Sequence, residues 1–145
     1  MAGSGLKATE IDLHRSVADY LNWMVLPPAV WTTFPAGWTA MRPGAAGRLR
    51  GCGLKAGMPD ILVFYNGSTL GIELKALGGK PTPVQRDMLG KLYTAGVKVH
   101  VAHSIDDVHA HLVNHGIPLR KSSYGNQASE GRRPQESAQG AARPA

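Results

Sequence analysis

Cysteine is almost absent from this chain of 145 residues, in which Cys52 is the one example. A lone cysteine forms neither an internal disulfide nor a zinc site built from cysteines, so we expect a reducing, cytoplasmic setting. Apolar runs are short, and none approaches the ~20 residues of a membrane-spanning helix. Residues 1–7 also lack the apolar stretch of a secretory signal. The sequence therefore argues against a disulfide-rich secreted protein and against a membrane protein.

Apolar side chains are missing from one long segment, residues 121–145. It contains no Ile, Leu, Val or Met and is rich in Ser, Gly, Gln and Pro. Such a composition cannot bury enough apolar surface to offset the entropy lost on ordering. We therefore expect one folded domain over residues 1–120 and a disordered, polar and basic tail over residues 121–145.

Acidic residues are outnumbered, since ten Asp and Glu face sixteen Lys and Arg, which gives a formal net charge of +6. The excess lies in the middle of the chain. Residues 42–98 contain nine basic residues and only Asp60, Glu73 and Asp87 as acids. A basic region of this kind is typical of a protein with a polyanionic partner such as nucleic acid.

Hydrophobic periodicity predicts a mixed α/β domain. Two helix starts are marked by capping boxes, Thr9 with Asp12 and Thr82 with Gln85. The expected elements are a helix over 9–24, a strand over 30–34, a long loop over 35–58 with one turn of helix near 45–50, a hairpin of strands 60–65 and 68–75, a helix from 82 that is closed by Gly96, a strand over 97–101 and a helix over 104–114. The apolar stripes of the first two long helices are expected to be Ile11, Val17, Leu21 and Met24, and Val84, Met88, Leu89 and Leu92.

The hairpin carries the most informative pattern. Asn66-Gly67 is a strong signal for a two-residue turn, which would pair Tyr65 with Ser68 and place Asp60 directly opposite Glu73. Alternation then puts six residues on one, almost wholly apolar, face: Ile61, Val63, Tyr65, Leu70, Ile72 and Leu74. Asp60, Glu73 and Lys75 fall on the other face.

Two directly opposed carboxylates lie ~5 Å apart and repel each other, which a divalent cation between them would relieve. Lys75 points to the same side and is placed to orient a water molecule or to hold a phosphate. A metal ion beside an ammonium group suits attack by water on a phosphodiester. The alternative is an exposed ion-pair cluster at a strand end, which is common on sheets.

These residues match a known family. Met58-Pro59-Asp60 followed by Ile72-Glu73-Leu74-Lys75 resembles the signature of the PD-(D/E)XK nucleases. The surrounding residues look like the VRR-NUC branch, in particular its compact stand-alone version from phages and prophages, and they span roughly residues 9–107. They are Pro35-Ala36-Gly37, Arg42, residues 46–51, residues 57–60, residues 71–75, Gly78, Pro83-Val84-Gln85 and Gly96-Val97.

The resemblance implies a restriction-endonuclease-like core, a mixed sheet flanked by helices in the order αβββαβ. It implies an endonuclease that hydrolyses DNA phosphodiesters with Mg²⁺ or Mn²⁺. Asp60, Glu73 and the backbone carbonyl of Leu74 would bind the metal, and Lys75 would serve the attacking water and the phosphate. Glu10 matches the acidic residue that the family places on its first helix as a further metal or water ligand, and Gln85 matches a glutamine near the metal site. The alternative for Glu10 is that an acid stabilises the helix N-terminus, and the alternative for Gln85 is that it only completes the capping box.

Basic residues near this site are expected to contact DNA phosphates: Arg42, Arg48, Arg50, Lys55, Lys80 and Arg86. Stand-alone members resemble Holliday-junction resolvases, which implies a homodimer acting on branched DNA. Two alternatives stay open, a non-catalytic nucleic-acid-binding relic of the fold and a restriction or repair nuclease that makes single cuts. Separately, His111 and His115 are spaced for zinc, but neither an acid nor a cysteine completes that set.

Overall fold

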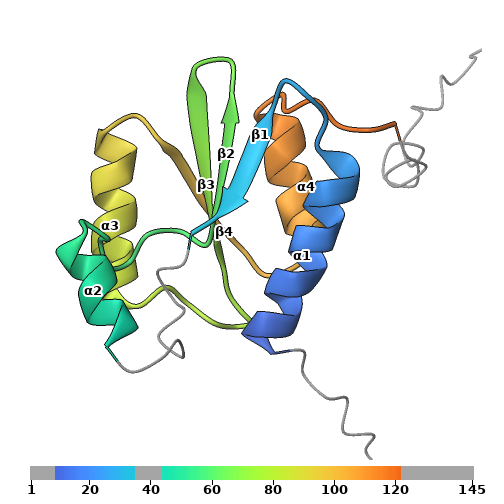
Figure 1. The fold of residues 1–145 in the computed structure, drawn as a ribbon. Coiled ribbons are helices and arrows are strands. Elements are labelled where there is room, and N and C mark those ends of the chain that lie inside the picture. The colour runs from blue at the N-terminus through green and yellow to red at the C-terminus, as the bar shows by residue number, and fades with distance from the viewer. Residues whose placement is uncertain (1–8, 35–43, 122–145) are drawn as a thin grey trace, which may run out of the picture.

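The protein, in a computed structural model that describes residues 9–34 and 44–121, is a four-stranded sheet between helices (Figure 1). The elements in chain order are α1 (Glu10–Met24), β1 (Val30–Thr33), α2 (Ala45–Gly51), β2 (Ile61–Tyr65), β3 (Ser68–Leu74), α3 (Pro83–Thr94), β4 (Lys98–Ala102) and α4 (Ile105–Asn114). The strands follow the order β1-β2-β3-β4, antiparallel except for the parallel pair β3–β4. This mixed sheet confirms the predicted fold class.

Some predictions lie outside the described residues. They are residues 1–8 of the expected domain, residues 35–43 of the predicted long loop with the proposed DNA contact Arg42, and the tail from residue 122 onward. Within the described part of the chain, no helix is long and apolar enough to cross a membrane.

Both capping boxes form as predicted. The Thr9 hydroxyl accepts from the backbone N–H of Asp12, whose carboxylate accepts from the N–H of Thr9. Thr82 and Gln85 make the same reciprocal pair at the start of α3. Each box satisfies two N–H groups that the first helical turn would otherwise leave without a partner. The local sequence therefore fixes the first turn of both helices.

The hairpin also has the predicted register. Tyr65 pairs with Ser68 and Ile61 pairs with Ile72 around the turn at Asn66 and Gly67, both of which have positive φ. The β4 strand begins at Lys98, one residue later than predicted. Val97 is not in the strand because its N–H donates to the carbonyl of Leu92 and closes the end of α3.

The main core lies between one face of the hairpin and the two helices α1 and α4. The predicted apolar face is fully or almost fully buried apart from Tyr65, which is partly buried. Val17 and Leu21 from α1 and Val108 and Leu112 from α4 complete this core. Figure 1 shows both helices on the same side of the sheet and α3 on the other side.

Two residues of the predicted helical stripes are exposed. Ile11 is 54% exposed and Val84 is 55% exposed. Ile11 lies six residues before Val17, and Val84 lies five residues before Leu89. At ~3.6 residues per turn these offsets rotate both side chains well away from the buried face.

The second face of the sheet positions the segment before β2. An added Cβ on Gly71 would lie 3.0 Å from the ring of buried Pro59, so Pro59 packs directly on the β3 backbone. Gly57 has a φ of +79°, and its added Cβ would lie 2.6 Å from the carbonyl oxygen of Val84 in the first turn of α3. Residues 57–59 are thus held between the sheet and α3, which places Asp60 directly before the start of β2.

Gly57→Ala is expected to lower the free energy of unfolding by more than about 2 kcal/mol, because it adds a backbone clash to the strain of positive φ. Gly53→Ala is the matched control, since Gly53 also has positive φ but open space around it. It should lose only about 1 kcal/mol. Urea unfolding of both variants measures the difference, and equal losses would contradict the role given to the close contact.

Candidate metal and active site

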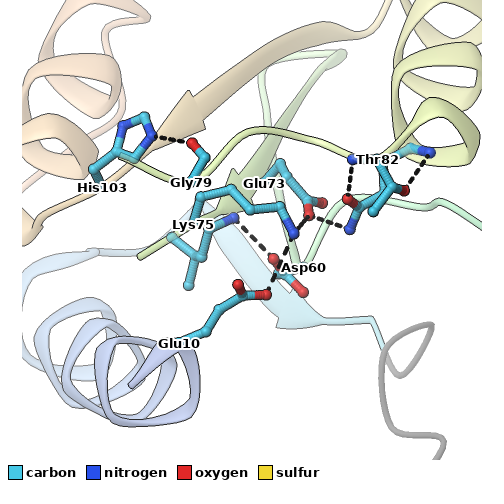
Figure 2. A network of polar contacts seen from close by, with 9 residues as sticks. Glu10, Asp60, Glu73, Lys75, Gly79, Thr82 and His103 are labelled. Atoms are coloured by element: carbon cyan, nitrogen blue, oxygen red, sulfur yellow. Dashed lines mark hydrogen bonds and ion pairs between the residues drawn. The ribbon is translucent and has the colours of Figure 1, made fainter. Parts of the chain in front are cut away.

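Residues from four parts of the chain meet at the end of the sheet where β2 begins and β3 ends. They are Glu10 on α1, Asp60 before β2, Glu73 and Lys75 at the end of β3, and Gln85 on α3. Figure 2 shows the side chains of Glu10, Asp60, Glu73 and Lys75 converging on one another. The structure therefore brings together all five side chains that the sequence predicts to be catalytic.

Glu73 is the centre of this arrangement and is fully buried, with 0% exposure. Its Oε1 atom lies 3.1 Å from Lys75 Nζ and accepts a hydrogen bond from the amide nitrogen of Gln85. Its Oε2 atom is the only buried side-chain oxygen or nitrogen without a hydrogen-bond partner among the described residues. Burial, followed by the charge of Asp60, raises the pKa of Glu73 to about 7.

Asp60 lies next to Glu73, as the extended hairpin register requires. Its carboxylate accepts a hydrogen bond of 2.8 Å from the backbone N–H of Leu74. Burial raises the pKa of Asp60, although the bond from Leu74 and the nearby His14 and Lys75 act in the opposite direction. Two carboxylates with raised pKa values thus share one partly enclosed site.

Lys75 is 7% exposed and touches two acids. Its Nζ lies 3.1 Å from Glu73 and 3.3 Å from Glu10. Burial by itself opposes the charge on this amine, but the contacts with Glu73 and Glu10 together outweigh it and raise the pKa of Lys75. The exposed ion-pair cluster considered from the sequence is therefore wrong for Glu73 and Lys75, which are both buried.

Gln85 both caps a helix and contacts the site. Its side-chain oxygen accepts from the Thr82 N–H at 2.8 Å, and its side-chain nitrogen donates to Glu73. The two ends of one amide therefore serve the predicted capping box and a contact with Glu73, while a place for Gln85 beside a metal stays a prediction. The capping box thereby sets the direction of the amide N–H toward the buried carboxylate.

A solved structure described as a VRR_NUC domain protein has a similar fold. It matches with a TM-score of 0.59 and 22% sequence identity, over 74% of this chain and 87% of that one. The fold is that of a VRR-NUC domain. The sequence itself matches no protein-family model and no curated protein. The fold implied by the sequence motifs is thus confirmed by the three-dimensional arrangement.

Five of the six predicted DNA contacts lie among the described residues, and all five are exposed on the surface of the fold. Lys80 and Arg86 stand on either side of Thr82, next to the turn that bears Gln85, and both are exposed. Arg48 and Arg50 are exposed on α2, and Lys55 is exposed in the segment that follows it. The contact of each with DNA, and the metal ligation by the Leu74 carbonyl, stay predictions.

Three residues around the site were missed by sequence reasoning. The Thr33 hydroxyl donates to the carbonyl of Asp60, and His14 contacts Thr33. His103 Nε2 lies 2.9 Å from the carbonyl oxygen of Gly79, in the loop between Lys75 and α3 (Figure 2). The one signal in the sequence was the spacing of His14, which lies four residues after Glu10 and so on the same side of α1.

The histidines near the end of the domain form a separate cluster. His100 stacks on His111 at 4.1 Å between ring centroids, and its Nε2 lies 2.8 Å from Nε2 of His115. Burial, followed by the neighbouring imidazoles, lowers the pKa values of His100 and His115. Across residues 9–34 and 44–121, no group of three or more His, Cys, Asp or Glu is arranged to hold a metal ion, in this cluster or elsewhere.

The raised pKa of Glu73 predicts how the stability of the metal-free protein depends on pH. The unfolded chain ionises Glu73 near the ordinary value of 4.5, whereas the native state keeps the proton up to about 7. Between these values the unfolded state binds fewer protons, so the free energy of unfolding falls as pH rises, by about 3 kcal/mol from this group. Glu73→Gln should remove that dependence.

Urea unfolding in the presence of a chelator, at several pH values from 4.5 to 8, provides the measurement. Asp87→Asn is the control, because Asp87 is an exposed acid paired with Lys91 on the surface of α3. It should keep the pH dependence of the wild type. An equal pH dependence in Glu73→Gln would show that another group is responsible.

Proposed function

We propose that the protein is a metal-dependent nuclease that hydrolyses DNA phosphodiesters and uses Mg²⁺ or Mn²⁺. The observation that carries this proposal is the Oε2 atom of Glu73, which is buried beside Asp60 without a partner. A buried polar atom without a partner destabilises a fold by about 1–3 kcal/mol. A cation at this position would satisfy that atom and would remove the repulsion between the two carboxylates.

The residues fit a small divalent cation. Mg²⁺ is usually held by one or two carboxylates and keeps several waters, so it does not need a cage of three acidic side chains. Asp60 and Glu73 would provide the two carboxylates, with the Leu74 carbonyl at the same strand end as a further oxygen. The raised pKa values of Asp60 and Glu73 agree with this, because they show that the site favours added positive charge over two ionised carboxylates.

A bound metal would act as a Lewis acid on the phosphate and would lower the pKa of water. The chain's own residues do the positioning. Gln85 donates to Oε1 of Glu73 and leaves Oε2 without a partner. Lys75 keeps its charge between Glu73 and Glu10, where an ammonium group is suited to stabilise an anionic phosphate or orient a water molecule. Glu10 is half exposed, so its ion pair with buried Lys75 reaches from the site to the protein surface.

DNA is the substrate class that the charge favours. The net charge of +6 and the exposed basic residues near Gln85 suit a phosphate backbone. The likeness to a solved VRR_NUC domain protein supports the same conclusion. We place the protein with enzymes that recognise the shape of branched DNA, because basic residues suited to phosphate contacts carry no sequence information.

Asp60→Ala and Glu73→Ala are expected to lower Mg²⁺-dependent DNA cleavage at least about 100-fold, because each removes a metal ligand. The assay is hydrolysis of labelled duplex, flap and four-way junction DNA with Mg²⁺ or Mn²⁺. Asp87→Asn should cleave as the wild type does. Cleavage of every substrate at the background rate by the wild type, with DNA binding intact, would favour the non-catalytic alternative instead.

Lys75→Met is expected to reduce the cleavage rate about 100-fold or more while metal binding persists, because an ammonium group assists the reaction but is not a metal ligand. Calorimetry with Mn²⁺ measures the binding, and circular dichroism checks the fold. A folded variant that has lost metal binding would contradict this division of roles between Lys75 and the two carboxylates.

Arg48→Ala and Arg50→Ala are expected to weaken binding to DNA of any sequence. Each lost phosphate contact should reduce the slope of log K against log salt by ~1. Lys98→Ala is the control, since Lys98 is exposed at the opposite end of the sheet, paired with Leu70. A loss confined to one DNA sequence would indicate base reading.

We also propose that the protein works as a homodimer. A four-way junction has near two-fold symmetry and needs two symmetric cuts, while one domain of this size provides one site. A closed two-fold dimer is the most common arrangement that supplies two sites. Light scattering of the full chain in moderate salt should give twice the 15.4 kDa mass of one chain. A monomer that makes paired cuts would overturn this assembly.

A further inference from the structure

The first two turns of α1 carry Glu10 to the site but have little core packing of their own. Val17 is the first fully buried side chain of α1, and Leu13 is only partly buried. Glu10 itself is half exposed and contacts the site through one ion pair, 3.3 Å from Lys75. A polar contact between these turns and the sheet would therefore contribute to holding this end of the helix.

His14 provides that contact. It lies one helical turn after Glu10, and its Nε2 atom is 2.9 Å from the hydroxyl oxygen of Thr33, the last residue of β1. The Thr33 hydroxyl lies 3.0 Å from the carbonyl oxygen of Asp60, to which it donates. One hydrogen-bonded chain thus runs from α1 through β1 to the backbone of Asp60.

The hydrogen-bonded chain from His14 to Asp60 also determines which group donates in the contact between His14 and Thr33. Thr33 has one hydroxyl hydrogen, and the bond to Asp60 uses it. The contact with His14 must then be donated by Nε2–H of the imidazole. Both the neutral Nε2–H form and the charged form of histidine have this hydrogen, so the contact does not depend on the protonation of His14.

The carbonyl of Asp60 is held by β1 from two directions. It accepts from Thr33 Oγ1 at 3.0 Å and from the backbone N–H of Phe34 at 2.8 Å. On the other side, the Asp60 carboxylate accepts from Leu74 at the end of β3. The position of Asp60 is thus determined by both neighbouring strands, and His14 joins α1 to the β1 side.

We infer that His14 is a positioning residue, which through Thr33 docks the first two turns of α1 and sets the positions of Glu10 and Asp60 at the site. This inference rests on the proposed function for its effect on metal binding, but the docking of α1 is a property of the fold alone. The second test below measures the docking without metal or DNA.

Four variants separate the donated hydrogen bond from simple packing. His14→Leu and Thr33→Val remove the donor and the hydroxyl at similar volume. His14→Gln places an amide N–H at a similar reach, and Thr33→Ser keeps the hydroxyl. We expect calorimetry of the full chain to show about ten-fold weaker Mn²⁺ binding for the first pair, as for other residues that orient a ligand, and near wild-type binding for the second pair.

Hydrogen exchange of the metal-free full chain gives the second readout. The amides of residues 13–17 should exchange several-fold faster in His14→Leu and Thr33→Val, while those near Leu21 keep their protection. The double variant should be no worse than Thr33→Val alone, because Thr33→Val already removes the contact with His14.

Three outcomes are decisive. Wild-type Mn²⁺ affinity and exchange in His14→Leu would overturn the inference. Equal losses in all four variants would overturn it as well, because the effect would then not depend on the donated hydrogen bond. A wild-type protein that binds no Mn²⁺ would overturn the proposed metal site, and the exchange data would then decide the docking role of His14 separately.

Discussion

The buried carboxylate of Glu73 is the constraint around which this end of the molecule is organised. It lies in the most hydrophobic hairpin of the chain, where transfer of a charged group from water is very unfavourable. Lys75 and Gln85 both contact Oε1 of this carboxylate, and Oε2 is left without a partner. Three separate elements therefore depend on this carboxylate: the end of β3, the loop after it and the first turn of α3.

The surrounding packing keeps these groups in place. Pro59 packs on Gly71, and Gly57 packs on the first turn of α3, so the approach to Asp60 follows the surface of the sheet. The Thr82–Gln85 capping box fixes the amide that reaches Glu73. Backbone positions that look like ordinary folding signals thus determine the geometry of the polar site, which explains why glycine, proline and capping residues cluster around it.

The site is unusual in its balance of charge. A core chosen for stability alone would not place two carboxylates side by side and leave one oxygen unsatisfied, because an unpaired buried polar group destabilises the native state. Local features that oppose stability are expected at functional sites. A bound cation would satisfy the free oxygen of Glu73 and remove the repulsion between the two carboxylates, and this reasoning leads from the geometry to the proposed nuclease.

Local interactions explain which features of the fold and the site the sequence alone could predict. Caps at Thr9 and Thr82, the Asn66-Gly67 turn and the register of Asp60 against Glu73 depend on residues close in sequence and on strict side-chain alternation. By contrast, the complete burial of Glu73, the contact of Glu10 with Lys75 and the chain from His14 to Asp60 join residues that are distant in sequence. They arise only when α1 packs on the hairpin and β4 pairs with β3, because no short-range pattern records which side chains those long-range contacts will bring together.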